Sequence, residues 1–379
     1  MSITLRIDDP RLVQSSTSHH PSVLRWPHPV LPARKLGRRR LVAITLLDRK
    51  YVLFRDESGK AAAVVDACPH RGALLSKGSV NQQGELVCAY HGWRIRSDGQ
   101  AQSAAVATRS CRIPRLRTWE RHGYIWIAHE DVLDSAFPEF LRPGYSMVAR
   151  FPMRFEAPLR VAVDNFSEVE HAFQVHRFIG PGKNQLDTVS MRTEIGDDRT
   201  SAVSSAQYRG LPLGLSRFFG IRRGDRYHND WVFQFQPLFG SYDNYWTSPA
   251  GQRRPVRFVV TTFFVPTAGG KATLHTFLQV AIDSPWFRLF RALIYWVSSA
   301  IIRYELWADA RIARFAPDTT DPRTAGWHLT KLDKQIIANR RLMETLYFQG
   351  SRLAPGPLSL LEPESDAVPT ATLQRAGGG

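Results

Sequence analysis

Two short segments in the first third of the chain each carry one cysteine and one histidine. The first reads C-P-H-R-G and contains Cys68 and His70, and the second reads C-A-Y-H-G-W and contains Cys88 and His91. Thiolate and imidazole groups are preferred ligands of soft and borderline transition metals. The four side chains therefore predict a metal site built from two loops.

The spacing of these ligands bears on which metal they hold. Zinc is one candidate, because two cysteines and two histidines are also a zinc ligand set. A zinc finger, however, pairs like ligands, whereas each segment here pairs a cysteine with a histidine in C-x-H or C-x2-H spacing. Gly72 and Gly92 let the backbone approach closely and donate amide hydrogen bonds to bridging sulfides. These features favour an iron-sulfur cluster over structural zinc.

A second group of candidate ligands lies at residues 164–176, with the sequence DNFSEVEHAFQVH. His171 and His176 are separated by about 140° on an ideal α-helix, so one straight helix cannot direct both at one ion. They converge only if the helix bends or ends between them, and the breaker G-P-G at residues 180–182 is compatible with that. By itself, H-x4-H is equally typical of two unrelated helix histidines.

Together, and in this order, the two motifs resemble those of Rieske non-haem iron oxygenases, over about residues 25–345. C-P-H-R-G with C-x-Y-H-G-W resembles the Rieske [2Fe-2S] signature, in which two cysteines hold one iron and two histidines hold the other. Residues 164–176 resemble the family motif E/D-N-x-x-D/E-x-x-H-x4-H. The resemblance implies a terminal oxygenase subunit of the homotrimeric, monooxygenase-like branch. Its neutral imidazoles make such a cluster easier to reduce than an all-cysteine one.

The resemblance also implies roles for single residues. His171 and His176 would supply two ligands of a 2-His-1-carboxylate site for Fe(II), whose open positions suit dioxygen as co-substrate. The carboxylate would come from a downstream helix. Asp309 is favoured, Glu305 one turn earlier is the alternative, and a solvated carboxylate paired with a neighbouring arginine remains open for either.

Two further residues take family positions near the iron. Glu168 corresponds to the bridging acid, which would connect His91 of a neighbouring subunit to His171 and carry electrons between the two metal sites. Aspartate is commoner at that position, and a capping or surface glutamate is the alternative. Asn165 would lie close to the iron. Cys111, outside both cluster loops, is expected to be an ordinary buried thiol.

The pattern along the chain predicts an α+β protein with two domains. An all-β Rieske domain precedes an α+β catalytic domain with an antiparallel, helix-grip-like sheet and long helices. Strands are expected at 231–239, 256–265 and 272–282, and helices at 161–176, 285–315 and 330–348. The predicted divisions are a flexible arm at 1–22, the Rieske domain at 23–145, the catalytic domain at 146–350 and a disordered tail at 351–379.

Composition bears on where the protein is located and on what kind of partner it binds. The 379 residues include three cysteines, too few for a disulfide framework, and the N-terminus lacks a secretion signal, so a reducing, cytoplasmic location is expected. The apolar run at 292–302 is about half the length that spans a bilayer. The net charge of +16 predicts an acidic partner. An anionic membrane surface near Arg288, Arg291 and Arg303 is the competing explanation.

The source of electrons must lie outside the chain, because no G-x-G-x-x-G motif opens a helix after a strand. A separate flavin reductase or ferredoxin would deliver electrons from NAD(P)H. Ferredoxins are typically acidic, so basic residues near the cluster loops could steer the donor, with a merely solvated basic surface as the alternative. These residues are Arg34, Lys35, Arg38, Arg39, Arg40 and Arg71. No recognition motif points to nucleic acid.

Aromatic strands predict a lipophilic or aromatic substrate. The candidates for the pocket are Phe233, Phe235, Phe239, Tyr242, Tyr245, Trp246, Phe263 and Phe264, with more bulk from Trp286 to Trp296 and with His228 and His275 as polar candidates. Hydroxylation, dealkylation, desaturation and oxidative cyclisation all suit such a site. The alternatives are a dihydroxylating aromatic-ring dioxygenase, a Rieske electron-transfer protein without oxygenase activity, and a zinc-stabilised binding protein.

Overall fold

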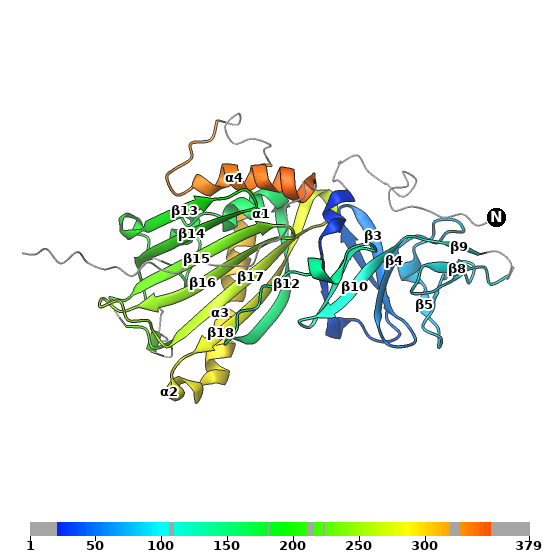
Figure 1. Cartoon of the computed structure of the whole chain (residues 1–379), viewed down its shortest axis with the longest axis horizontal. Helices are drawn as coiled ribbons and strands as arrows, with labels where there is room; N and C mark the ends of the chain where they lie inside the picture. Colours follow the sequence, from blue (N-terminus) through cyan, green and yellow to red (C-terminus); the bar gives the residue numbers. More distant parts are fainter. Residues whose placement is uncertain are drawn as a thin grey trace, which may run out of the picture.

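A computed structural model describes residues 21–105, 110–180, 182–210, 216–217, 219–222, 224–318 and 326–349. Within these residues the chain forms three antiparallel sheets in two parts that lie end to end (Figure 1). The architecture confirms the predicted all-β part followed by an α+β part. Most of the predicted arm, residues 1–20, and the predicted tail at 351–379 lie outside the described residues.

The N-terminal part contains two antiparallel sheets, with strand orders β1-β11-β10-β4-β3-β2 and β5-β6-β7-β8-β9. The first comprises β1 (His28–Pro32), β2 (Val42–Leu46), β3 (Arg49–Arg55), β4 (Ala61–Val65), β10 (Arg115–Arg121) and β11 (Tyr124–His129). The second comprises β5 (Ser79–Val80), β6 (Leu86–Val87), β7 (Arg94–Ile95), β8 (Gln100–Gln102) and β9 (Ser110–Arg112). Short 3-10 turns lie at Pro21–Arg25, Ala33–Lys35, Leu75–Lys77 and Asp134–Ala136.

The C-terminal part is built on a seven-stranded sheet in the order β12-β18-β17-β16-β15-β14-β13. Its strands are β12 (Ser146–Pro158), β13 (Ser190–Ile195), β14 (Arg199–Gln207), β15 (Arg226–Phe235), β16 (Leu238–Thr247), β17 (Val256–Pro266) and β18 (Lys271–Ile282). The prediction of one strand at 231–239 was wrong, because the segment is a hairpin that turns at Gln236 and Pro237. Proline has no amide hydrogen with which to continue the ladder.

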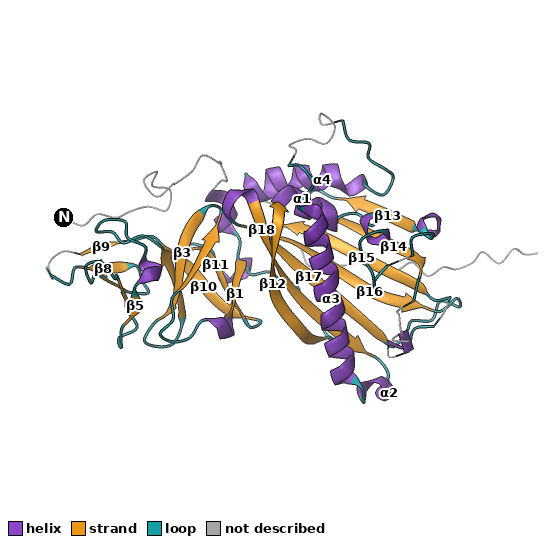
Figure 2. Ribbon diagram, turned by 180° about the vertical axis from the view of Figure 1, so that it is seen from behind, coloured by secondary structure: helices purple, strands orange, loops and turns teal. Residues whose placement is uncertain are grey.

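Helices cover one face of this sheet, and Figure 2 shows α3 (Arg291–Ala313) running across it. The segment at 285–315, predicted as one helix, begins with a separate short helix, α2 (Pro285–Arg288). The segment predicted at 330–348 forms α4 (Lys334–Leu342), which continues as a π-helix over Met343–Phe348. No helix among the described residues is long and apolar enough to cross a membrane.

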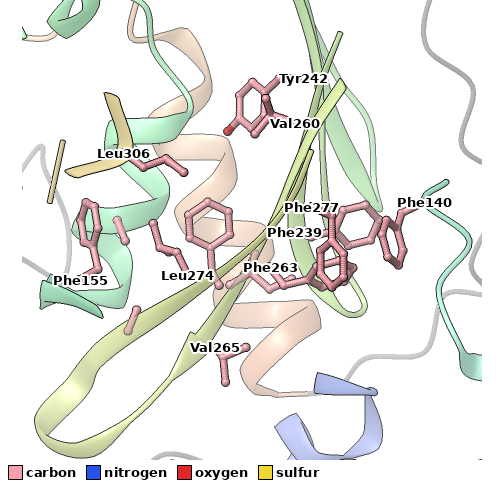
Figure 3. Packing of buried hydrophobic residues seen from close by; sticks show 14 of the residues in the cluster. Phe140, Phe155, Phe239, Tyr242, Val260, Phe263, Val265, Leu274, Phe277 and Leu306 are labelled. Carbon is pink, nitrogen blue, oxygen red and sulfur yellow. The ribbon is translucent and has the colours of Figure 1, made fainter. Parts of the chain in front are cut away.

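Aromatic side chains join the two parts of the molecule. Trp126 on β11 packs edge-to-face on Phe263 of β17 with ring centroids 5.0 Å apart, and stacks on Phe277 of β18 at 5.8 Å. Phe140, from the connection between the parts, contacts both phenylalanines. Figure 3 shows Phe140, Phe239, Phe263 and Phe277 gathered together. We call these residues and Trp126 the aromatic seam. It makes the two parts share one buried core.

Candidate metal centres and substrate pocket

The two Cys-His loops have the same backbone construction. In each loop the glycine amide donates a hydrogen bond to the cysteine carbonyl, from Gly72 to Cys68 at 2.8 Å and from Gly92 to Cys88 at 3.0 Å. Both glycines have positive φ angles, 73° and 68°, which a β-carbon would strain. The glycines are therefore needed for the shape of the loops, which present their ligands in matching ways.

The four candidate ligands of these loops divide by burial. Cys68 and Cys88 belong to the small core of the N-terminal part, whereas His70 and His91 are exposed and face each other with their Nδ1 atoms 3.1 Å apart. Burial raises the pKa of the Cys68 thiol to about 11, so a bound metal must displace its proton. Two inner sulfurs and two outer imidazoles are the donor set of a Rieske cluster, with its histidine side open to the surface.

The helix that precedes the second candidate site ends earlier than its sequence predicts. α1 spans Leu159–Phe166, and a 3-10 turn begins at His171, so the predicted helix over 161–176 was wrong as a continuous element. The carboxylate of Glu168 accepts hydrogen bonds from the backbone amides of Glu170 and His171 and so caps the second turn. The chain thus breaks ahead of both histidines.

Three side chains converge after this break. Oδ1 of Asp309, on α3, lies 3.0 Å from Nε2 of His176 and 3.5 Å from Nε2 of His171. The ligand atoms of all three residues lie within 4.8 Å of one another. Burial alone would raise the pKa of Asp309, but the two imidazoles outweigh it and lower the pKa. The arrangement of two imidazoles and one carboxylate suits ferrous iron and leaves positions open on a six-coordinate ion.

Glu168 holds the ring of His171 from the other side. Nδ1 of His171 donates a hydrogen bond to Oε1 of Glu168 over 2.5 Å, which leaves Nε2 to face Asp309. Burial lowers the pKa of His171, but Glu168 and Asp309 outweigh it and raise the pKa to about 9. The negative charge around this imidazole therefore favours a cation. A carboxylate behind a metal-binding histidine fixes its tautomer and orientation.

Glu305, the alternative carboxylate, is engaged elsewhere. Its buried carboxylate accepts hydrogen bonds from the backbone amides of Arg177, Phe178 and Ile179, at 2.5 to 3.1 Å. It holds the loop that follows His176. The group of side chains placed to share one ion contains Asp309 and not Glu305.

A cavity of about 110 Å³ opens beside the three converging ligands, between α1, α3 and strands β14–β17. Its walls are largely aliphatic, from Val169, Val189, Val260, Ile302 and Leu306. Polar groups reach it from the sheet, where the side chains of Asn229 and Asn244 lie on paired strands. A mostly apolar pocket with a few polar groups is typical of a small-molecule site.

Comparisons with known proteins agree with this layout. Residues 26–119 match the family profile of the Rieske [2Fe-2S] domain. The structure resembles crystalline dicamba monooxygenase bound to 3,6 dichlorosalicylic acid, with a TM-score of 0.65 and 20% identity over 87% of this chain and 99% of that one. Residues 26–119 thus form a Rieske [2Fe-2S] domain, and the chain as a whole has the fold of dicamba monooxygenase.

Sequence relatives cover less of the chain than the structural match does. A vanillate O-demethylase oxygenase subunit from Pseudomonas sp. (strain ATCC 19151) is 32% identical over 163 residues, 41% of this chain and 48% of that protein. Chlorophyllide a oxygenase from Oryza sativa subsp. japonica is 30% identical over 161 residues, 42% of this chain and 30% of that protein. The matches span less than half the length of these two relatives.

The pocket contains only one of the eight aromatic residues predicted for it, Tyr242. The reason is the alternation of side chains along a strand. Tyr242 pairs with Val260 across β16 and β17 on the helix-covered face, whereas Phe239 pairs with Phe263 on the opposite face. Figure 3 shows these two groups apart, with Leu306 of α3 near the first. Phe239 and Phe263 thus join the aromatic seam.

The other predicted pocket residues pack elsewhere. Phe264 lies under α1, 5.3 Å from the ring of Phe166, and Phe233 stacks on Phe264. His228 stacks on Tyr245 and bonds to Thr247, while His275 is buried against the N-terminal part. Phe235 is fully buried, and Trp246 lines a separate small cavity. Trp286 and Trp296 add no bulk to the pocket, because they are 65% and 70% exposed.

Arg209 is a residue of the site that the sequence does not reveal. Its guanidinium donates hydrogen bonds to the backbone carbonyls of Ala172, His176, Ile179 and Gly180, at 2.7 to 3.2 Å. Glu305 accepts hydrogen bonds from the backbone amides of the same loop. Together, Arg209 and Glu305 fix the segment that carries His176. No local pattern marks Arg209, since its partners lie about 30 residues earlier in the chain.

α1 carries two further residues of interest. Asn165 lines the same pocket as Asp309, and its buried Nδ2 has no hydrogen-bond partner among the described residues. Asp164 forms a buried ion pair with Arg340 of α4, with Nε 3.1 and 3.0 Å from the two carboxylate oxygens. This pair anchors α1 to the C-terminal helix. Cys111 is half-buried on β9 and packs against the small core that contains Cys68 and Cys88.

Proposed function

We propose that this chain is the terminal oxygenase component of a Rieske-type system, with dioxygen as co-substrate. Cys68, His70, Cys88 and His91 would hold the [2Fe-2S] cluster, and His171, His176 and Asp309 would hold the mononuclear Fe(II). The observation that carries the proposal is that the last three residues converge beside an apolar pocket. Bound ferrous iron supplies the activation of dioxygen.

The protein's own residues would prepare this site in two ways. Glu168 keeps Nδ1 of His171 protonated, so that Nε2 is presented as the ligand. Arg209 and Glu305 hold the backbone around His176, so the ligand is positioned before metal arrives. A preformed site of this kind loses little conformational freedom when it binds its ion.

Electrons would pass between copies of the chain. His91 is exposed on a loop of the N-terminal part, from which it could meet Glu168 of a neighbouring copy beside that copy's iron site. An acid hydrogen-bonded to ligand imidazoles of both centres would give a short path for electron transfer. The active form would then be a head-to-tail homotrimer, in which each site is completed by its neighbour.

The donor would be a ferredoxin or flavin reductase that draws on NAD(P)H. Arg71 lies in a cluster loop, and the other predicted basic residues, Arg34, Lys35 and Arg38–Arg40, are exposed on the same N-terminal part. A positive surface of this kind attracts an acidic partner and raises its rate of association. We assign the system to the cytoplasm, where thiols such as Cys111 stay reduced.

The substrate would be a lipophilic or aromatic small molecule. The aliphatic walls of the pocket favour apolar surface, and Asn229, whose buried Oδ1 has no hydrogen-bond partner among the described residues, offers an acceptor that could orient a polar group. Relatives named as vanillate and dicamba O-demethylase components and a 3-ketosteroid-9-alpha-monooxygenase component support this class. The reaction would be hydroxylation, dealkylation or oxidative cyclisation.

Metal analysis tests the proposal. The purified protein should contain about three irons per two acid-labile sulfides, with a reduced-cluster EPR signal whose average g lies below 2. His171→Ala should remove about one iron and all turnover while the EPR signal of the cluster stays. About two irons per two sulfides in the wild-type protein would instead identify an electron carrier, and zinc without sulfide would refute both readings.

A further inference from the structure

An exposed apolar surface lies where α2 meets the first turns of α3. Its five large side chains are exposed by 39% to 72%, and they are Trp286, Leu289, Phe290, Leu293 and Trp296. Backbone hydrogen bonds continue through the junction, for example from the amide of Ile294 to the carbonyl of Phe290 at 3.0 Å. The rings of Trp286 and Phe290 meet edge-to-face with centroids 5.9 Å apart, and Leu293 and Trp296, three residues apart on α3, share one face of that helix. We call the five side chains, with Arg288 and Arg291, the α2–α3 corner.

The corner lies at an extremity of the molecule. Figures 1 and 2 show α2 at the lower end of the C-terminal part, away from the N-terminal sheets. Two tryptophans that are 65% and 70% exposed are unusual on a surface that only meets water. Such a projecting apolar surface can meet a flat partner without a clash from the rest of the described chain.

Positive charge borders the apolar side chains. Arg288 and Arg291 are both exposed, and neither has a carboxylate within ion-pair distance among the described residues. The nearby Asp283 is paired with Arg257 at 3.2 Å. The whole chain carries a net charge of +16. Tryptophan, leucine and phenylalanine with adjacent arginines form the composition that binds the interface of an anionic bilayer.

A second copy of the same surface fits this charge pattern poorly. In a symmetric contact, the corner of one copy would face the corner of the other, and Arg288 and Arg291 would approach their own counterparts. Like charges without intervening acids oppose such a contact. A bilayer with anionic headgroups instead takes the apolar side chains into its interface and neutralises the arginines. We propose that the α2–α3 corner docks this protein on an anionic lipid surface.

The interior of the protein next to the corner is also apolar. A small apolar cavity lined by Phe219, Trp246 and Phe258 lies between the sheet and α3, and it shares Ile179 and Ile302 with the metal pocket. Beside it, Gly220 lies close to Phe287 of α2. Packed apolar side chains thus lie between the corner and the wall of the metal pocket. Entry of a substrate dissolved in lipid on this side would rest on the proposed function, whereas docking itself does not.

Vesicle flotation of the full-length protein tests the docking without any measurement of turnover. Wild-type protein should float with vesicles of equal parts phosphatidylglycerol and phosphatidylcholine and should not float with phosphatidylcholine alone. Leu289→Ser should weaken binding about tenfold because a buried leucine is lost from the interface. Arg288→Gln with Arg291→Gln should weaken it roughly 25-fold, at about fivefold for each charge.

Leu133→Ser is the matched control, because Leu133 is 66% exposed in the N-terminal part and Leu289 is 72% exposed at the corner. It should bind the anionic vesicles as wild type does. Equal binding by both serine variants, or no flotation of the wild type, would overturn the proposal. A smaller assembly of Leu289→Ser in light scattering would also overturn it, since the corner would then be a contact between copies. A protein that lacks the mononuclear iron can still float, so failure of the proposed function is distinguishable.

Discussion

Glu305 and Asp309 lie one helical turn apart on α3, yet their isosteric amide variants should fail in different ways. Glu305→Gln replaces one carboxylate oxygen with an NH2 group that faces backbone amides, so donors meet donors. Three amides, from residues 177–179, now bond to that carboxylate. Hydrogen bonds to a charged group contribute about 1.5 to 3 kcal/mol each. Weakening all three hydrogen bonds and losing one of them should lower the free energy of unfolding by about 3 kcal/mol.

Thermal unfolding and metal analysis measure the two effects separately. For a part of about 200 residues, about 3 kcal/mol corresponds to a fall in Tm of roughly 6 to 12 °C. Glu305→Gln should show this fall and still bind the mononuclear iron when loaded at low temperature. Asp309→Asn should lose that iron and keep the cluster. If Glu305→Gln loses the iron as completely as Asp309→Asn does, with Tm unchanged, the assignment of the two carboxylates is wrong.

Three further predictions concern other parts of the structure. Burial lowers the pKa of His275 to about 3 and that of His28 to about 4. The unfolded chain therefore binds protons first as the pH falls below 6.5, so each of these histidines should lower the free energy of unfolding by about 2 kcal/mol between pH 6.5 and 5. In denaturant titrations over this range, His275→Phe should lose about 2 kcal/mol less than the wild type, and the same change in both proteins would contradict the prediction. Arg209→Lys should weaken the mononuclear iron about 10- to 100-fold in an iron titration, because lysine cannot span four carbonyls; wild-type affinity would show that the clamp is dispensable. Gly92→Ala puts a β-carbon 3.3 Å from that of Ala104 at a positive φ, so labile sulfide per chain should fall, and full cluster content would refute the strain argument.

The candidate ligands were predictable because each set lies in a short, self-contained segment. Cys68 with His70, and His171 with His176, are close in sequence and of types that metals prefer. Asp309 depended on the family resemblance, since α3 offers two acids one turn apart. The two acids differ because backbone amides of a distant loop, residues 177–179, bond to Glu305 and not to Asp309. The sequence of α3 does not reveal this contact.

The lining of the pocket was less predictable for a different reason. Aromatic residues along β15–β17 are dense on both faces, and composition does not tell which face the helices cover. The strand pairing decides it, because Tyr242 and Phe239 belong to opposite faces of one strand. The prediction that Trp286 and Trp296 add bulk to the pocket was wrong. Large apolar side chains on a helix are more often buried, whereas these two are exposed to solvent.

The aromatic seam has a consequence for how electron delivery can be controlled. Domains joined by a small polar contact usually move against one another, but Trp126, Phe140, Phe263 and Phe277 form a continuous apolar joint. Swinging the cluster-bearing part towards its own iron site would expose these rings to water. The spacing of the two proposed centres within a chain is therefore set at folding, and under the proposed function regulation would be left to the meeting of copies, the arrival of the donor and the occupancy of the pocket. A fragment of residues 23–145 would expose Trp126 and tend to aggregate, so the electron-carrying half is not a separable module.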